Sequence, residues 1–140
     1  MMLSTITCLA VAIYFEARSE PIAGQLAVAQ VVLNRVANER YPDTVCEVIM
    51  EGPTYPSGHP VQDKCQFSFW CDGKPEDIHD YEAWQTALRV ATIATETSAL
   101  PIDISEGAMF YHATSVSPSW RHTMQMTARI GQHIFYRLED

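Results

Sequence analysis

The sequence predicts a mainly α-helical fold with a smaller extended part (α+β), formed by a single domain over residues 1–140. The chain is 47% hydrophobic and 19% charged, which is ordinary for a protein that folds around one core. Residues 22–36 and 80–99 carry apolar side chains at three- and four-residue steps, the period of a helix with one buried face. A stretch rich in proline and glycine separates them and predicts long loops in the middle of the chain.

The first helix is expected over residues 3–17, which are apolar over much of their length. A helix that is apolar on most of its sides is usually central in a fold. Residues 18–20 then form a short polar corner, and Pro21 suits the first turn of the next helix, over residues 22–36. The two helices are therefore predicted to meet at this corner.

The middle of the chain is expected to hold little regular structure. Thr44 and Glu47 have the spacing of a capping box, which predicts a short helix that ends near Met50. Residues 52–64 hold three prolines and two glycines and predict a loop. Residues 65–71 are rich in aromatic side chains and too short for a stable helix.

The last part of the chain combines a long helix with extended segments. Residues 72–75 predict a turn, and residues 80–99 predict the second long helix. Residues 107–112 have the character of a strand, residues 117–120 could start another helix, and residues 131–138 close the chain.

The formal net charge of -8 argues against nucleic acid as a partner. A protein that binds phosphates usually clusters Lys and Arg on one surface, whereas the nine basic residues of this chain are dispersed. We therefore expect no nucleic-acid partner, and we expect a monomer.

Residues 1–12 are apolar and end in Ala10, Val11 and Ala12, a pattern that could pass for a signal-peptide cleavage site. However, the apolar run is short and no positive charge precedes it, so we expect a native first helix instead. No apolar run has the length needed to span a membrane.

The four cysteines, Cys8, Cys46, Cys65 and Cys71, leave several interpretations open. A disulfide between Cys65 and Cys71 would close a short loop, and buried free thiols are an equally simple alternative. A zinc site is less favoured, since no Cys-x-x-Cys or His-x-x-x-His pair accompanies the cysteines. We expect no metal and no cofactor.

Glu16 lies near the end of the first predicted helix, directly after Ile13, Tyr14 and Phe15. The negative end of the helix dipole and the apolar neighbours both raise the pKa of this carboxyl group, and Arg18 would oppose them. A carboxyl group with a raised pKa can donate a proton near neutral pH, which cleavage of a glycosidic bond requires. A solvated acid at a helix end is the alternative interpretation.

Glu20 follows Glu16 by four residues and would be a second carboxylate on the same face if the helix continued. The corner before Pro21 argues against that geometry. An acid in this position also interacts favourably with the first turn of the next helix. We therefore expect Glu20 to have a structural role at the helix start.

Five blocks in order along the chain resemble the SleB-type cell wall hydrolase family, which includes spore-cortex-lytic enzymes and related bacterial and phage peptidoglycan hydrolases. The blocks are IYFEARSE at 13–20, GQLAVAQVVLNRV at 24–36, YPDTVC at 41–46, CQFSFWCDG at 65–73, and residues 107–136, which include Tyr-His, Trp and Gly-x-His-x-Phe-Tyr. The resemblance therefore spans nearly the whole chain.

This resemblance implies a lysozyme-like or lytic transglycosylase-like fold that acts on peptidoglycan glycan strands. The catalytic glutamate of the family corresponds to Glu16, which would protonate the bond between N-acetylmuramic acid and N-acetylglucosamine. In a lytic transglycosylase the 6-hydroxyl of the sugar then attacks, so one acid suffices. Simple hydrolysis would need a second carboxylate, for which Glu20 and Asp72 are the nearest candidates. A protein of this kind without a signal peptide could stay in the cytoplasm until a phage lysis factor releases it.

Sugars present apolar faces to aromatic rings and hydroxyl groups to amides and hydroxyls. Residues of both kinds occur in the blocks 65–73 and 107–136, and some of these aromatic side chains could instead belong to the core. The candidates for substrate binding are Gln66, Ser68, Trp70, Tyr111, His112 and Trp120.

Two other function classes remain open at this point. Cys65 or Cys71 with His112 could supply the nucleophile and base of a peptidase or amidase that acts on the stem peptide. A peptidoglycan-binding module without catalytic activity is the second alternative.

Overall fold

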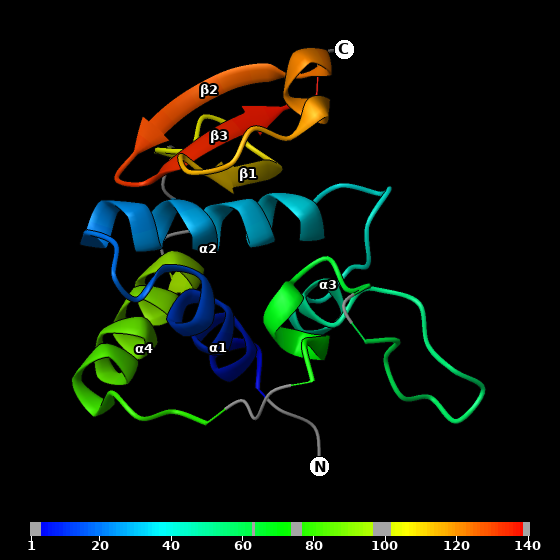
Figure 1. Ribbon diagram of the computed structural model, residues 1–140. Helices are drawn as coiled ribbons and strands as arrows, with labels where there is room; N and C mark the ends of the chain where they lie inside the picture. Colours follow the sequence, from blue (N-terminus) through cyan, green and yellow to red (C-terminus); the bar gives the residue numbers. More distant parts are fainter. Residues whose placement is uncertain (1–3, 63, 74–76, 97–101, 139–140) are drawn as a thin grey trace.

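The computed structural model places helix α2, Ile22–Val36, in the middle of the molecule (Figure 1). A three-stranded sheet covers one side of α2, and the helices α1, α3 and α4 pack on its other side. This is the mainly α fold with a small β part that the sequence predicts. The structure describes residues 4–62, 64–73, 77–96 and 102–138.

Helix α1, Thr5–Ala17, leads into the corner that precedes α2. The Ser4 hydroxyl caps its start by accepting a hydrogen bond from the backbone N–H of Thr7 at 3.1 Å. The corner is closed by the Glu20 N–H, which donates to the Ala17 carbonyl at 2.9 Å. Pro21 is the N-cap residue of α2, so both helices and the corner lie where the sequence predicts them.

Helix α3, Val45–Ile49, starts at the predicted cap. The Thr44 hydroxyl accepts from the Glu47 N–H at 3.2 Å and donates to the Glu47 carboxylate at 2.8 Å. The following loop contains one isolated β-bridge, between Thr54 and Pro60. The aromatic block then forms only a single 3-10 turn, η1, Ser68–Cys71.

Helix α4, Tyr81–Glu96, packs against α1. Its first turn is capped by Asp80, whose carboxylate accepts from the Ala83 N–H at 3.0 Å. The hydroxyl of Tyr14 in α1 accepts from the backbone N–H groups of His79 and Asp80 at 3.1 and 3.0 Å, which fixes the entry to α4. The predicted extension to residue 99 lies outside the described residues. Within the described ranges, no helix combines the length and apolar character that crossing a membrane requires.

The sheet is antiparallel, with β3, His133–Arg137, in its centre. The strand β1, Phe110–Ala113, pairs with one edge of β3, and β2, Gln125–Ile130, pairs with the other. The 3-10 turn η3, Ser119–Thr123, connects β1 to β2. The strand character near residue 110 and the helical turn near residue 120 are therefore confirmed.

The strand β2 is absent from the sequence prediction. It lies at an edge of the sheet and contains no fully buried residue, and Met126 is 60% exposed. A bulge between Met126 and Ala128 also breaks its alternation. An edge strand of this kind leaves little hydrophobic pattern in the sequence.

Two hydrophobic clusters lie on opposite sides of α2. Ala29 and Val32 belong to the larger cluster, which α2 forms with the other helices. Val28 and Val31 belong to the smaller cluster, which also contains Phe135 of β3. Because α2 is buried on both sides, it determines how the sheet sits relative to α1.

Two disulfides connect all four cysteines. Cys8 of α1 is joined to Cys46 of α3, a pair that the sequence interpretation does not contain. Cys65 is joined to Cys71 and closes the loop that carries the aromatic block. The interpretation of the cysteines as buried free thiols is therefore wrong.

Gly131, in the turn between β2 and β3, is expected to be costly to replace. Its φ is +58°, and an added Cβ would lie 2.7 Å from Glu20 Oε1 and 3.1 Å from Pro21 Cδ. Gly131→Ala should lower the free energy of unfolding by about 1–2 kcal/mol, as measured by urea denaturation. Gly58→Ala is the matched control, because φ is +90° there and nothing lies within 4 Å of the added Cβ. Equal losses in the two variants would contradict a role for the contact with Glu20.

Candidate active site

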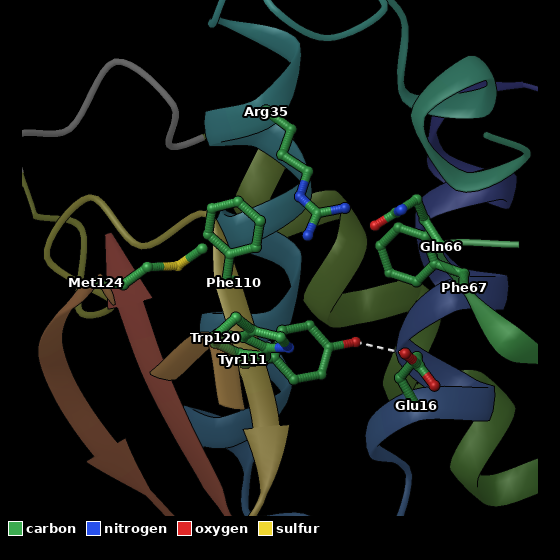
Figure 2. A pocket seen from close by; sticks show the side chains of 8 residues that line it. All are labelled: Glu16, Arg35, Gln66, Phe67, Phe110, Tyr111, Trp120 and Met124. Atoms are coloured by element: carbon green, nitrogen blue, oxygen red, sulfur yellow. Dashed lines mark hydrogen bonds between the residues drawn. The ribbon is translucent and has the colours of Figure 1, made fainter. Parts of the chain in front are cut away.

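A pocket of about 450 Å³ opens where α1, α2, the aromatic block and the sheet meet (Figure 2). Glu16 comes from α1 and Arg35 from α2, whereas the remaining side chains come from the aromatic block and from the segment that contains β1 and η3. The lining residues are Glu16, Arg35, Gln66, Phe67, Phe110, Tyr111, Trp120 and Met124.

Glu16 is the acidic side chain in this lining, and it is partly buried. The hydroxyl of Tyr111 donates a hydrogen bond of 2.5 Å to Glu16 Oε1. The two residues are 95 positions apart in the sequence. The bond therefore links the last turn of α1 directly to β1.

The pKa of Glu16 is raised above its ordinary value. Burial is the largest cause, because it penalises the charged carboxylate. The hydrogen bond from Tyr111 and the positive charge of Arg35 oppose this effect. The sequence interpretation assigned the opposing charge to Arg18, which is instead exposed and stacks on Tyr14 with its guanidinium carbon 4.7 Å from the ring centroid.

Tyr111 is held in place by its neighbours in the sheet. Its ring centroid lies 5.0 Å from that of His133 and 5.7 Å from that of Phe135. Burial and the adjacent Glu16 raise the pKa of Tyr111 well above its ordinary value. The phenol therefore stays protonated and remains a hydrogen-bond donor to Glu16.

Tyr111→Phe is expected to raise the pKa of Glu16 further, because the variant loses a donor that stabilises the carboxylate. A general acid must be protonated, so activity falls as the pH rises through its pKa. The alkaline limb of the pH–rate profile should move to higher pH in the variant. A limb that stays in place or moves to lower pH would contradict the coupling. Tyr81→Phe removes an exposed tyrosine hydroxyl outside the pocket and serves as a control.

The candidates for substrate binding fall into two groups. Gln66, Tyr111 and Trp120 lie in the pocket with Glu16. Ser68 is exposed on η1 but does not line the pocket, and Trp70 lines a separate apolar pocket against α1 and α3.

His112 is buried outside the pocket. Its Nε2 lies 2.9 Å from the Tyr136 hydroxyl, and its Nδ1 lies 2.8 Å from the Ala113 carbonyl oxygen. Its ring also packs against Trp120, at 5.6 Å between centroids. His112 therefore supports the pocket wall from behind and does not line the pocket itself.

Neither candidate for a second carboxylate lies in the pocket lining. Glu20 Oε1 accepts from the backbone N–H of Gln132 at 2.7 Å and lies 3.5 Å from His133 Nδ1, so this side chain anchors the turn between β2 and β3. The expected role of Glu20 at the start of α2 is therefore wrong, since no side chain caps that helix and the carboxylate bonds the turn between β2 and β3 instead. Asp72 follows η1 and also lies outside the lining.

A thiol nucleophile is incompatible with this arrangement. Cys65 and Cys71 are bonded to each other, and His112 is hydrogen-bonded within the sheet. The hypothesis of a Cys–His peptidase or amidase is therefore wrong. The described residues contain no group of three or more His, Cys, Asp or Glu side chains that could hold a metal ion.

Four residues that line the pocket are not among the predicted site residues: Arg35, Phe67, Phe110 and Met124. Arg35 carries a signal that could have revealed it. It follows Val28, Val31 and Val32 at helical spacing, so it stands on the buried side of α2. A charged residue in such a position needs a specific partner or a function.

A helical domain with a small sheet, in which one partly buried carboxyl group faces an open pocket, has the architecture of lysozyme-like glycosidases. The chain belongs to the cell wall hydrolase family, whose sequence profile matches residues 19–136. This match begins three residues after Glu16, so the role of Glu16 depends on the geometry described above.

Several relatives and solved structures resemble the chain. It is 34% identical to the spore cortex-lytic enzyme of Halalkalibacterium halodurans over 131 residues, which are 93% of this chain and 34% of the relative. The catalytic domain of Bacillus cereus SleB has 30% identity and a TM-score of 0.65, over 95% of this chain and 89% of that domain. The catalytic domain of the germination-specific lytic transglycosylase SleB from Bacillus anthracis has 28% identity and a TM-score of 0.67, over 98% and 97%.

The chain spans about a third to two-fifths of the length of the curated relatives that it matches. By contrast, it spans nearly the whole of the two solved catalytic domains. The similarity therefore concerns the catalytic part of these longer proteins.

Proposed function

We propose that this chain cleaves the glycan strand of peptidoglycan between N-acetylmuramic acid and N-acetylglucosamine, with Glu16 as the general acid. The observation that carries the proposal is the geometry of Glu16, which is partly buried, has a raised pKa and receives a hydrogen bond from Tyr111 at an open pocket. Membership of the cell wall hydrolase family and the similarity to the catalytic domain of a germination-specific lytic transglycosylase support the proposal.

In the proposed reaction the protonated oxygen of Glu16 donates its proton to the glycosidic oxygen, and the bond from that oxygen to the anomeric carbon breaks. The resulting Glu16 carboxylate then accepts the proton of the 6-hydroxyl as its oxygen attacks the same carbon. The product is a 1,6-anhydro sugar. Tyr111 donates to Oε1 throughout and stabilises the carboxylate that exists between the two proton transfers.

Transglycosylation is favoured over hydrolysis by the composition of the pocket. Hydrolysis by inversion needs a second carboxylate about 6.5–9.5 Å away, and retention needs one at about 5–5.5 Å. Among the described residues, Glu16 is the sole acid in the pocket lining. A single acid is sufficient for transglycosylation, because the 6-hydroxyl of the sugar replaces the water or carboxylate that would attack in hydrolysis.

Mass spectrometry of peptidoglycan digested with the purified protein tests this proposal. We expect soluble fragments that end in 1,6-anhydro-muramic acid. Fragments with a reducing muramic acid would show hydrolysis, and a reducing N-acetylglucosamine would show that a different bond is cut. Binding to cell walls without release of fragments would favour the non-catalytic binding module.

The two disulfides support a site of action in an oxidising compartment, which is where such bonds persist. The bacterial cell wall lies in such a surrounding. If the chain stays in the cytoplasm before its release, its four cysteines are reduced there, and the two disulfides form only after release. We further propose that the chain acts as a monomer.

A further inference from the structure

Arg35 is a buried cation that points into the pocket. It is only 6% exposed, and its Nε donates to the Met109 carbonyl at 2.8 Å. Its guanidinium carbon lies 5.2, 5.6 and 5.3 Å from the ring centroids of Tyr41, Phe67 and Phe110. Figure 2 shows the guanidinium group between the rings of Phe110 and Phe67, with its terminal nitrogens directed into the pocket.

Within the described residues no acid is hydrogen-bonded or ion-paired to Arg35; its charge acts only at longer range on Glu16, whose pKa it lowers. Glu16 Oε1 is bonded to Tyr111 instead. The two terminal nitrogens of Arg35 have no hydrogen-bond acceptor among these residues, yet they are not enclosed by protein. They are therefore free to bind a ligand in the pocket.

A charge in this position is costly unless a partner compensates it. The three aromatic rings offset part of the cost through cation–π interactions. An apolar side chain would pack against the same rings without any such cost, so packing alone does not account for a guanidinium group here. A ligand with a negative charge would account for it.

We propose that Arg35 binds a carboxylate of the glycan strand and thereby selects which muramic acid residues enter the pocket. The planar fork of a guanidinium group matches the two oxygens of a carboxylate. The inference rests on the proposed function, because it places peptidoglycan in this pocket. The carboxylate has two possible sources, the lactyl group of muramic acid after removal of the stem peptide, or the stem peptide itself.

The test compares substrates before it compares variants. Glycan strands without stem peptides and strands that carry them are each prepared in two forms, with free carboxylates and with carboxylates converted to methylamides. For one of the two strand types, the kcat/KM of the wild-type protein should be about tenfold or more lower with the amidated form than with the free carboxylate. The reason is that amidation removes the ionised acceptor of the hydrogen bonds from Arg35. The strand type that shows the loss identifies the source.

Variants then assign this preference to Arg35. Arg35→Gln should cleave free and amidated strands at equal rates, and Arg35→Lys should retain part of the preference because it keeps the charge but not the fork. Arg89→Gln, an exposed position of α4 outside the pocket, controls for net charge and should keep the full preference. Circular dichroism confirms that each variant is folded.

The outcomes separate this inference from the proposed function. Equal cleavage of free and amidated strands by the wild-type protein, or an unchanged preference in Arg35→Gln, would overturn the carboxylate site while cleavage itself stands. If no strand is cleaved, the proposed function fails. In that case, calorimetry measures the affinity of the protein for each of the four substrates. Equal affinities for free and amidated strands would overturn the carboxylate site at Arg35.

Discussion

Glu16→Gln is expected to lower the rate of glycan-strand cleavage by about 10²–10⁴-fold. The amide cannot donate a proton to the glycosidic oxygen, but it fills nearly the same volume and can still accept the hydrogen bond from Tyr111. The release of soluble fragments from purified cell walls measures the effect. Binding to the same walls should persist, because the other lining residues are unchanged.

Glu20→Gln is the matched control, since Glu20 lies four residues further along the same motif. Its side chain anchors the turn at Gln132, outside the pocket, so the variant should keep its activity within about threefold while losing some stability. Full activity in Glu16→Gln would exclude Glu16 as the acid. A comparable loss in both variants would point to a carboxylate pair instead.

Removal of the disulfide between Cys8 and Cys46 is expected to cost about 3–4 kcal/mol of the free energy of unfolding. The bond closes a loop of 38 residues, and closing such a loop restricts the unfolded chain. It also fastens α3 to α1, beside the larger hydrophobic cluster. Urea denaturation of the double variant Cys8→Ala/Cys46→Ala measures the loss.

The second disulfide is the natural comparison. Cys65 and Cys71 are separated by only six positions, so Cys65→Ala/Cys71→Ala should cost about 2 kcal/mol in the same model of loop closure. Cys65→Ala/Cys71→Ala should nevertheless lower activity more than Cys8→Ala/Cys46→Ala does, because the short loop carries Gln66 and Phe67 into the pocket. A greater loss of stability for the short loop would contradict the entropic account.

The helices could be predicted from the sequence because their signals are local. Thr44 and Glu47 stand at the start of α3, and the apolar positions of α2 repeat at the helical period. The raised pKa of Glu16 could be predicted because its apolar neighbours lie directly beside it in the sequence. These features need no knowledge of distant contacts.

The rest of the site depends on contacts that no local pattern encodes. The hydrogen bond between Tyr111 and Glu16 joins residues 95 positions apart, and Glu20 meets Gln132 across 112 positions. Ser68 and Trp70 are neighbours of Gln66 in the chain, yet the 3-10 turn η1 directs them away from the pocket. Membership of a sequence block therefore did not determine which side chains face Glu16.

The two hydrophobic clusters make the geometry of the pocket sensitive to partial unfolding. Glu16 stands on α1 beside the larger cluster, whereas Tyr111 packs on the smaller cluster beneath the sheet. A sheet that loosens from α2 would separate the two residues while the helices remain folded. Under the proposed function, cleavage is therefore expected to be lost before the helical circular dichroism signal during gradual denaturation.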